Sequence, residues 1–196
     1  TAMDMIFSPV LTVCGIDELP GQRDRAVTHV LSIVDPDLPE LEAFASYAQH
    51  HRTTLRFHDI ISEIPDRVMP HPDHVAAVLA FGSDFLARQE QDAQSHLLVH
   101  CHMGISRSTA AMLTLMAQAN PDEEAEDLFR RLVEIRPQAW PNSQMISFAD
   151  EQLGRGGDLT AALRRHYGRQ LRVQPKYTEW MTMLGREAEL RMALTD

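Results

Sequence analysis

Four short segments of the chain carry the side-chain pattern of β-strands. Two consist mainly of β-branched or other apolar residues, as buried strands do, and two alternate apolar with polar positions. The predicted strands are residues 7–13, 28–34, 53–58 and 96–100. Because proline cannot donate a hydrogen bond to a neighbouring strand, Pro9 predicts an edge position or a late start for the first strand.

The segments around these strands have the periodicity of helices. The predicted helices are residues 38–51, 72–89, 107–119, 121–136, 159–170 and 178–194. The helix over 107–119 is apolar almost all round, which predicts a buried position in the middle of the domain. Asn120 is the predicted N-cap of the next helix, with Glu123 at its third position. The glycine-rich residues 154–157 predict a helix end and a turn. No predicted strand precedes them, which argues against a phosphate loop.

Strands that alternate with helices predict an α/β fold. We expect a single domain whose central, mostly parallel sheet is flanked by helices on both faces. The chain has 196 residues, of which 44% are hydrophobic and 23% charged. It is therefore long enough to bury one core, and its composition excludes a fibrous or wholly disordered chain.

The charge and the cysteine count narrow the class of protein. The formal net charge is −10, and an acidic chain without a basic patch is a poor candidate for binding nucleic acid. Two cysteines cannot build a disulfide framework, no apolar run is long enough to span a membrane, and the first residues lack the basic region of a secretory signal. We expect a cytoplasmic protein that binds neither nucleic acid nor membrane.

The segment richest in chemistry is residues 100–109, between an apolar strand and the buried helix. Ligands of α/β folds bind at the carboxyl ends of strands, where a helix N-terminus also offers unpaired N–H groups to an anion. Cys101 lies at this junction. The positive end of the helix and the guanidinium of Arg107 both favour its thiolate, which is a strong nucleophile.

The residues between Cys101 and Arg107 suffice to wrap a loop around one small anion. Gly104 permits a backbone conformation that other residues avoid, and Arg107 adds a planar fork that binds two oxygens. Ser108 can donate to the sulfur, and His100 is expected to orient the loop through hydrogen bonds. Both residues are expected to stabilise the thiolate. The predicted oxyanion site comprises His102, Met103, Gly104, Ile105, Ser106 and Arg107. It requires no metal or other cofactor. The competing interpretation is a packed core thiol beside a solvated arginine.

Two groups of residues resemble the cysteine-dependent protein tyrosine phosphatases. His100-Cys101-x5-Arg107-Ser108 resembles their signature loop. Arg136-Pro137-x3-Pro141-Asn142, followed by Phe148 and Gln152-Leu153, resembles a segment of the dual-specificity group. The resemblance is closest to that group and to small bacterial relatives. It implies a catalytic domain over residues 5–153 and leaves residues 154–196 as a helical extension, which we expect to pack on or beside that domain.

The resemblance implies a phosphomonoester hydrolase acting on a phosphoprotein or phosphopeptide. In that family the cysteine attacks phosphorus and forms a phosphocysteine, while the arginine binds the equatorial oxygens. An aspartate protonates the leaving oxygen and then activates water. By resemblance, Cys101 and Arg107 take the first two roles, with phosphate or another oxyanion held in the loop.

Three aspartates are candidates for the general acid. Asp59 directly follows a predicted strand, as the acid does in dual-specificity enzymes, and is our first choice. Asp66 precedes Pro70 and the next helix with the spacing of tyrosine-specific enzymes. Asp73 lies at the start of that helix, where a capping role is the simpler interpretation.

The sequence is also compatible with several other functions. The chain could be an inactive relative that binds phosphoproteins, or a phosphatase of phosphoinositides or inositol phosphates. The absence of lysine from the loop argues against the second, although a protonated His102 could partly substitute. An arsenate reductase would place its cysteine loop after the first strand, not after the fourth. Cys14 is expected to be a core residue, with a redox partnership to Cys101 as the alternative.

Overall fold

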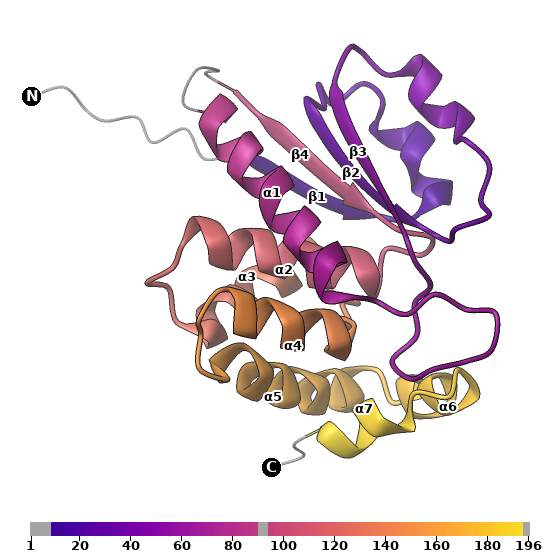
Figure 1. Cartoon of the computed structure of the whole chain (residues 1–196), viewed down its shortest axis with the longest axis vertical. Coiled ribbons are helices and arrows are strands. Elements are labelled where there is room, and N and C mark those ends of the chain that lie inside the picture. Colours follow the sequence, from indigo (N-terminus) through magenta and orange to yellow (C-terminus); the bar gives the residue numbers. More distant parts are fainter. Residues whose placement is uncertain (1–8, 90–93, 194–196) are drawn as a thin grey trace, which may run out of the picture.

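The computed structural model describes residues 9–89 and 94–193, and a wholly parallel four-stranded sheet lies at its centre (Figure 1). The strands are β1 (Val10–Cys14), β2 (His29–Val34), β3 (His51–Arg56) and β4 (His96–His100), in the spatial order β1-β4-β2-β3. The central strands β2 and β4 are buried along their whole length, whereas the edge strand β3 begins with exposed residues. These observations confirm the predicted fold class.

The predicted strands are confirmed with small shifts at their ends. β1 starts directly after Pro9 and lies at an edge of the sheet, as the proline predicts; residues 7 and 8 lie outside the described residues. β3 begins at His51, earlier than predicted.

Helices cover one face of the sheet in successive layers, and shorter 3-10 helices cover the other (Figure 1). They are α1 (Pro72–Gln89), α2 (Arg107–Ala119), α3 (Ala125–Ile135), α4 (Ser143–Gln152), α5 (Asp158–Val173), α6 (Lys176–Met183) and α7 (Glu187–Met192), with η1 (Ile16–Gln22) and η2 (Glu42–Ser46) opposite. Successive side chains along each strand point to opposite faces of the sheet, so the strands contribute to a core on each face. Leu31 and Val99 join the large core under the helices, while Val30 and Leu98 join a small core under η1 and η2. None of the described helices is long and apolar enough to cross a membrane.

The prediction of a helix over residues 38–51 is wrong. Such a helix would place Leu41, Phe44, Ala45 and Ala48 on one apolar face. Only Phe44 is buried, while Ala45 and Ala48 are exposed. A single buried side chain gives too little packing to sustain an α-helix. The segment forms only the 3-10 turn η2 before β3 begins.

Two further helix boundaries differ from the prediction. Asn120 caps the C-terminus of α2, because both its backbone and its side-chain N–H donate to the carbonyl of Met116, and α3 starts only at Ala125. The helix predicted over 178–194 is divided into α6 and α7 at Gly185, whose φ of +71° ends α6. Residue 194 lies outside the described residues.

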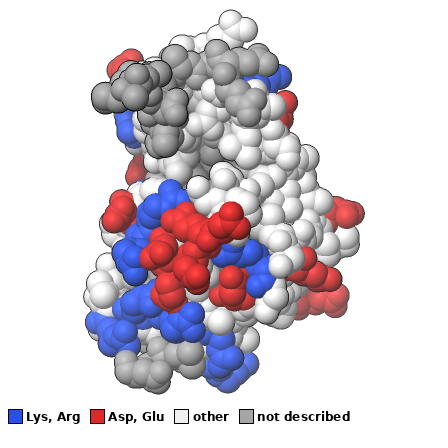
Figure 2. Space-filling view, turned by 90° about the vertical axis from the view of Figure 1, so that its left-hand side faces the viewer, with Lys and Arg blue, Asp and Glu red and all other residues white. Residues whose placement is uncertain are grey.

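The C-terminal helices share the main core. Leu159, Leu163 and Tyr167 of α5 are fully buried, and the ring of Trp140 stacks on Tyr167 with 4.2 Å between centroids. At the surface, Figure 2 shows acidic and basic side chains side by side. Glu126 of α3 forms ion pairs with arginines of α5. Such exposed pairs contribute little stability, so burial is what holds the extension.

The parallel register brings the carboxyl ends of all four strands to one edge. Cys14 and Ser32 both lie beside His100, and Val34 lies beside Arg56. The segments that follow the strands therefore converge beside the N-terminus of α2. This edge carries the candidate site.

Candidate active site

The loop between β4 and α2 turns its carbonyl groups outward. The acceptors and their donors are His102 O from the amide of Ile16 at 2.9 Å, Met103 O and Gly104 O from Arg136 at 3.0 and 2.9 Å, and Ile105 O from the amide of Trp140 at 2.8 Å. The amides of residues 102–107 donate to no group within residues 9–89 and 94–193. The loop therefore offers a row of N–H groups beside the N-terminus of α2, the arrangement that binds an anion.

Both the backbone conformation and the lack of space require a glycine at position 104. Its φ is +71°, and a Cβ at this position would lie 2.5 Å from the carbonyl carbon of Cys14 and 2.7 Å from Nη2 of Arg136. The loop thus packs directly against the end of β1, where no side chain fits. Arg136 is held in turn by a two-bonded ion pair with Glu18, at 2.6 and 2.8 Å.

We expect Gly104→Ala to deform this loop and weaken anion binding. Gly154→Ala is the matched control, because Gly154 has a similar φ of +64° but no atom within 4 Å of its Cβ position. Each variant carries the left-handed strain of about 1–2 kcal/mol, and only Gly104→Ala adds a backbone clash. Urea unfolding measures the loss of stability in each variant, and titration with inorganic phosphate measures the loss of anion binding. Equal losses in the two variants would contradict this interpretation.

Cys101 lies at the bottom of the loop and is 3% exposed. Its Sγ is 3.1 Å from the hydroxyl oxygen of Ser108. His100 acts on the loop backbone rather than on the sulfur: its Nδ1–H donates to the carbonyl of Cys101 at 2.9 Å, and its Nε2 accepts from Ser32 at 2.6 Å. Burial lowers the pKa of His100 to about 4, so the ring is neutral and keeps this orientation at neutral pH.

Arg107 is buried and only partly satisfied. Its Nη1 donates to Asp35 Oδ1 at 2.8 Å and to the carbonyl of Phe57 at 2.6 Å, whereas its Nε is buried without a hydrogen-bond partner in the described chain. A buried, unpaired guanidinium N–H is costly unless a ligand accepts from it, and it therefore fits an oxyanion site.

Asp35, which directly follows β2, is a site residue that no motif in the sequence singles out. Its backbone N–H donates to Nε2 of His102 at 3.0 Å. Burial, together with the charge of Arg107, lowers the pKa of His102, so its imidazole is neutral at neutral pH.

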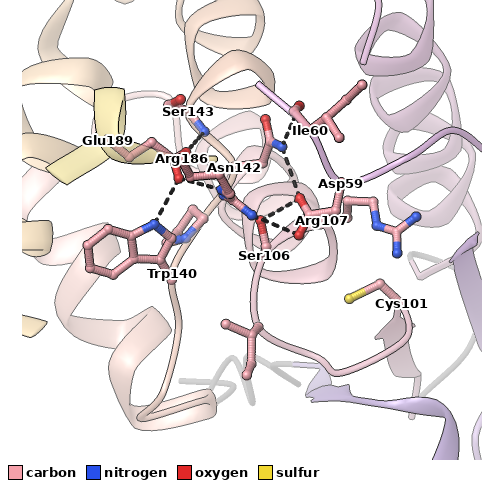
Figure 3. Close-up of polar contacts among 12 residues, drawn as sticks. Asp59, Ile60, Cys101, Ser106, Arg107, Trp140, Asn142, Ser143, Arg186 and Glu189 are labelled. Atoms are coloured by element: carbon pink, nitrogen blue, oxygen red, sulfur yellow. Dashed lines mark hydrogen bonds and ion pairs between the residues drawn. The ribbon is translucent and has the colours of Figure 1, made fainter. Parts of the chain in front are cut away.

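Asp59 accepts hydrogen bonds on both carboxylate oxygens (Figure 3). Oδ1 accepts from Ser106 Oγ at 2.7 Å and from Asn142 Nδ2 at 3.0 Å, and Oδ2 accepts from Arg186 Nη1 at 2.8 Å. Burial by itself raises the pKa of Asp59, but the charges of Arg186 and Arg107 and these hydrogen bonds outweigh it and hold the pKa below its ordinary value. The carboxyl group is therefore ionised.

Arg186 and Glu189, from the C-terminal extension, are also site residues that sequence reasoning missed. Glu189 Oε1 accepts from Arg186 Nε at 2.7 Å and from the indole of Trp140 at 2.9 Å. Its Oε2 accepts from the amide of Ser143 at 2.8 Å and from the hydroxyl of Tyr167 at 3.0 Å. Arg186 is 1% exposed and Glu189 0%.

A pocket of about 430 Å³ opens above Cys101. Its walls come from the segment after β3, the loop before α2, and the C-terminal segment around α6. The lining residues are Asp35, His58, Asp59, Ile60, Ile64, Arg67, Cys101, His102, Met103, Ile105, Ser106, Arg107, Trp180, Met181, Met183, Leu184 and Arg186. The structure thus brings the predicted nucleophile, arginine and first-choice acid to one pocket.

The other candidate residues lie elsewhere. Asp66 is exposed, has a φ of +63° and does not line the pocket, although its neighbours Ile64 and Arg67 do. Asp73 lies in the first turn of α1 beside His71, where its charge suits the helix dipole.

Cys14 is fully buried at the end of β1 as a free thiol. Burial raises its pKa to about 12, so Cys14 is a thiol rather than a thiolate at neutral pH. Its proposed redox partnership with Cys101 stays a prediction.

The chain resembles known proteins in its structure but not in its sequence. No family model and no curated protein matches the sequence. Among solved structures, human DUSP28 has 17% identity and a TM-score of 0.56, over 76% of this chain and 94% of its own. Tk-PTP in its active form has 16% identity and a TM-score of 0.52, over 75% and 92%. A human tyrosine phosphatase-like serine/threonine/tyrosine-interacting protein has 18% identity and a TM-score of 0.51, over 73% and 87%.

The chain therefore has the fold of the cysteine-dependent tyrosine and dual-specificity phosphatases. At these identities the likeness is one of fold.

Proposed function

We propose that this chain is a phosphomonoester hydrolase of the protein tyrosine phosphatase type. The observation that carries the proposal is that Cys101, the loop after it and Arg107 line one pocket, while the amides of residues 102–107 and the Nε–H of Arg107 have no partner within residues 9–89 and 94–193. A nucleophile beneath a ring of anion donors suits attack on the phosphorus of a phosphate monoester.

The proposed reaction has two steps. The Cys101 thiolate attacks phosphorus, the bond from phosphorus to the leaving oxygen breaks, and Asp59 gives its proton to that oxygen. Water then attacks the phosphocysteine, Asp59 takes a proton from the water, and inorganic phosphate and the thiolate are released. Arg107 and the loop amides stabilise the charge on the equatorial oxygens in both steps. Ser108, 3.1 Å from the sulfur, stabilises the thiolate as it leaves.

Arg107 must exchange partners when substrate binds. In the structure one of its nitrogens is paired with Asp35, whereas Nε is unpaired. We infer that phosphate oxygens bind Nε and compete with Asp35 for the guanidinium. Between turnovers, Asp35 keeps the side chain of Arg107 in its position at the pocket.

The mouth of the pocket favours an aryl phosphate. Ile64, Met103, Met183 and Leu184 line it with side chains that are 41%, 58%, 76% and 48% exposed. Exposed apolar side chains gathered around a polar floor suit a ligand with an apolar body and a charged end, such as phosphotyrosine. The absence of lysine from the loop disfavours an inositol carrying several phosphates.

A second candidate function is phosphoprotein binding without turnover. It is favoured by Asp59, which is ionised and fully engaged and so has no proton to donate in the observed arrangement. Among the fold neighbours, the human phosphatase-like interacting protein bears a name of this kind.

Phosphate release from matched phosphotyrosine, phosphoserine and phosphothreonine peptides tests the proposal. We expect turnover in the presence of a metal chelator, with phosphotyrosine hydrolysed fastest because of the apolar mouth. Retained binding of the peptides without turnover would favour the binding function instead. Turnover restricted to phosphoserine and phosphothreonine would contradict the inferred aryl preference.

A further inference from the structure

The side chain of Arg186 reaches from the C-terminal extension into the active site. Its Nη1 donates to Asp59 Oδ2 at 2.8 Å, and its Nη2 donates to Ser106 Oγ at 2.9 Å. The Ser106 hydroxyl donates in turn to Asp59 Oδ1 at 2.7 Å. The guanidinium fork therefore closes a ring that joins the acid–base carboxylate to the phosphate loop (Figure 3).

This position of the guanidinium is strongly enforced. The backbone N–H of Arg186 donates to the carbonyl of Met181 at 2.8 Å, directly after the left-handed turn at Gly185. Glu189 holds Nε at 2.7 Å and is itself held by Trp140. Every nitrogen of the guanidinium is engaged, so the fork has little freedom to leave Asp59.

An anchor for the chain end would not need this geometry. Glu189 alone ties the C-terminal segment to Trp140, Ser143 and Tyr167. The additional bonds from Arg186 go to two groups that line the pocket, Asp59 and Ser106, and Arg186 lines the pocket itself. The contacts thus point to a role at the reaction centre.

We propose that Arg186 is a positioning residue, which holds the Asp59 carboxylate as an anion against Ser106 and thereby restricts proton donation to the leaving group. This inference rests on the proposed phosphatase function and deepens it. With little protonated Asp59 at neutral pH, the leaving oxygen must depart largely without a proton. A phenolate is a far better leaving group than an alkoxide, so the restriction selects aryl over alkyl phosphates.

Other charged and titratable groups line the pocket with Asp59, interact with it electrostatically, or pair with Arg186. They are Arg107, His102 and Cys101 from the phosphate loop and α2, Asp35 after β2, His58 and Arg67 on its own segment, Tyr167 of α5, and Glu189 beside Arg186. Arg186 is the only one of them that forms an ion pair with Asp59 among the described residues.

The sign of the pH dependence follows from this pairing. A general acid works in its protonated form, so the contribution of Asp59 is greatest at acidic pH and falls as the pH rises through its lowered pKa. Removing the positive charge of Arg186 raises that pKa and moves the fall to higher pH.

The test compares phenyl phosphate with para-nitrophenyl phosphate, whose leaving group needs less protonation. In Arg186→Met we expect the ratio of kcat/KM for phenyl phosphate to that for para-nitrophenyl phosphate to rise about tenfold at neutral pH. The same substitution in an Asp59→Asn background should leave the ratio unchanged. An unchanged ratio in Arg186→Met, or an equal rise in the Asp59→Asn background, would overturn the proposal.

Three further variants separate charge from packing. Arg186→Met alone leaves Glu189 buried without its cation, so Arg186→Met/Glu189→Gln removes both charges and should show the same rise. Arg186→Lys retains the charge and should keep the ratio near that of the wild type; a rise as large as in Arg186→Met would assign the effect to packing and overturn the proposal. Arg191→Met, at an exposed arginine of α7, is the control and should change nothing.

A titration that needs no turnover distinguishes the two proposals. NMR observation of the Asp59 carboxyl carbon should show a pKa below the ordinary aspartate value in the wild type and a higher one in Arg186→Met/Glu189→Gln. This shift together with an inactive wild type would refute the phosphatase and would leave standing only that Arg186 holds the Asp59 carboxylate as an anion. Turnover without the shift would refute only the role of Arg186.

Discussion

Cys101→Ser is expected to abolish phosphate release from every substrate while leaving anion binding intact. A serine hydroxyl at this position has no base to ionise it, whereas the cysteine gains its nucleophilicity from the thiolate. We expect a fall in kcat on the order of 10⁴ or more. The proposed anion donors are backbone amides and Arg107, which the substitution leaves in place. Single-turnover phosphate release and calorimetric titration with inorganic phosphate measure the two properties.

Cys14→Ser is the matched control for this experiment. Cys14 is the other cysteine of the chain, equally buried at the end of the neighbouring strand, and it does not line the pocket. Turnover that survives in Cys101→Ser would contradict the covalent mechanism. Loss of phosphate binding in Cys101→Ser, with the fold intact by circular dichroism, would show that the sulfur rather than the amides holds the anion.

The parts of the site that are close in sequence could be predicted from the sequence. Cys101, Gly104, Arg107 and Ser108 lie within one strand–loop–helix junction, so local rules about strand ends, glycine and helix N-termini suffice. Asn120 shows where local rules fail, because the same residue type suits either end of a helix. It was assigned to the start of α3 and instead ends α2.

The parts of the site that depend on tertiary contacts could not be predicted from the sequence. Asp59 and Arg186 are 127 positions apart and meet only because α5 packs on α4 and α6 packs on α5. No spacing in the sequence relates them, and an arginine after a glycine gives no signal of burial. The helix predicted over residues 38–51 failed for a related reason. Periodicity marks an apolar face, but whether that face is covered depends on the rest of the fold.

Asp59→Asn is expected to lower kcat/KM for alkyl phosphates, phosphoserine peptides included, by on the order of 10²–10⁴ at acidic pH. The loss should shrink as the pH rises, because the lowered pKa of Asp59 leaves less of the acid to lose. It should also be smaller for para-nitrophenyl phosphate, whose leaving oxygen needs little protonation. Measuring kcat/KM of wild type and variant over a range of pH, with a phosphoserine peptide and with para-nitrophenyl phosphate, tests the loss, its dependence on pH and its dependence on the leaving group.

Asp66→Asn is the control that decides between the two acids. Asp66 is exposed at a φ of +63°, a conformation that asparagine tolerates well, so the substitution leaves the fold intact. We expect its pH profile to match that of the wild type. If Asp66→Asn carries the loss and Asp59→Asn is mild, the segment after β3 must rearrange in the reaction to bring Asp66 over Cys101. The ion pair between Asp59 and Arg186 would then serve to fasten that segment to the C-terminal extension and take no part in proton transfer.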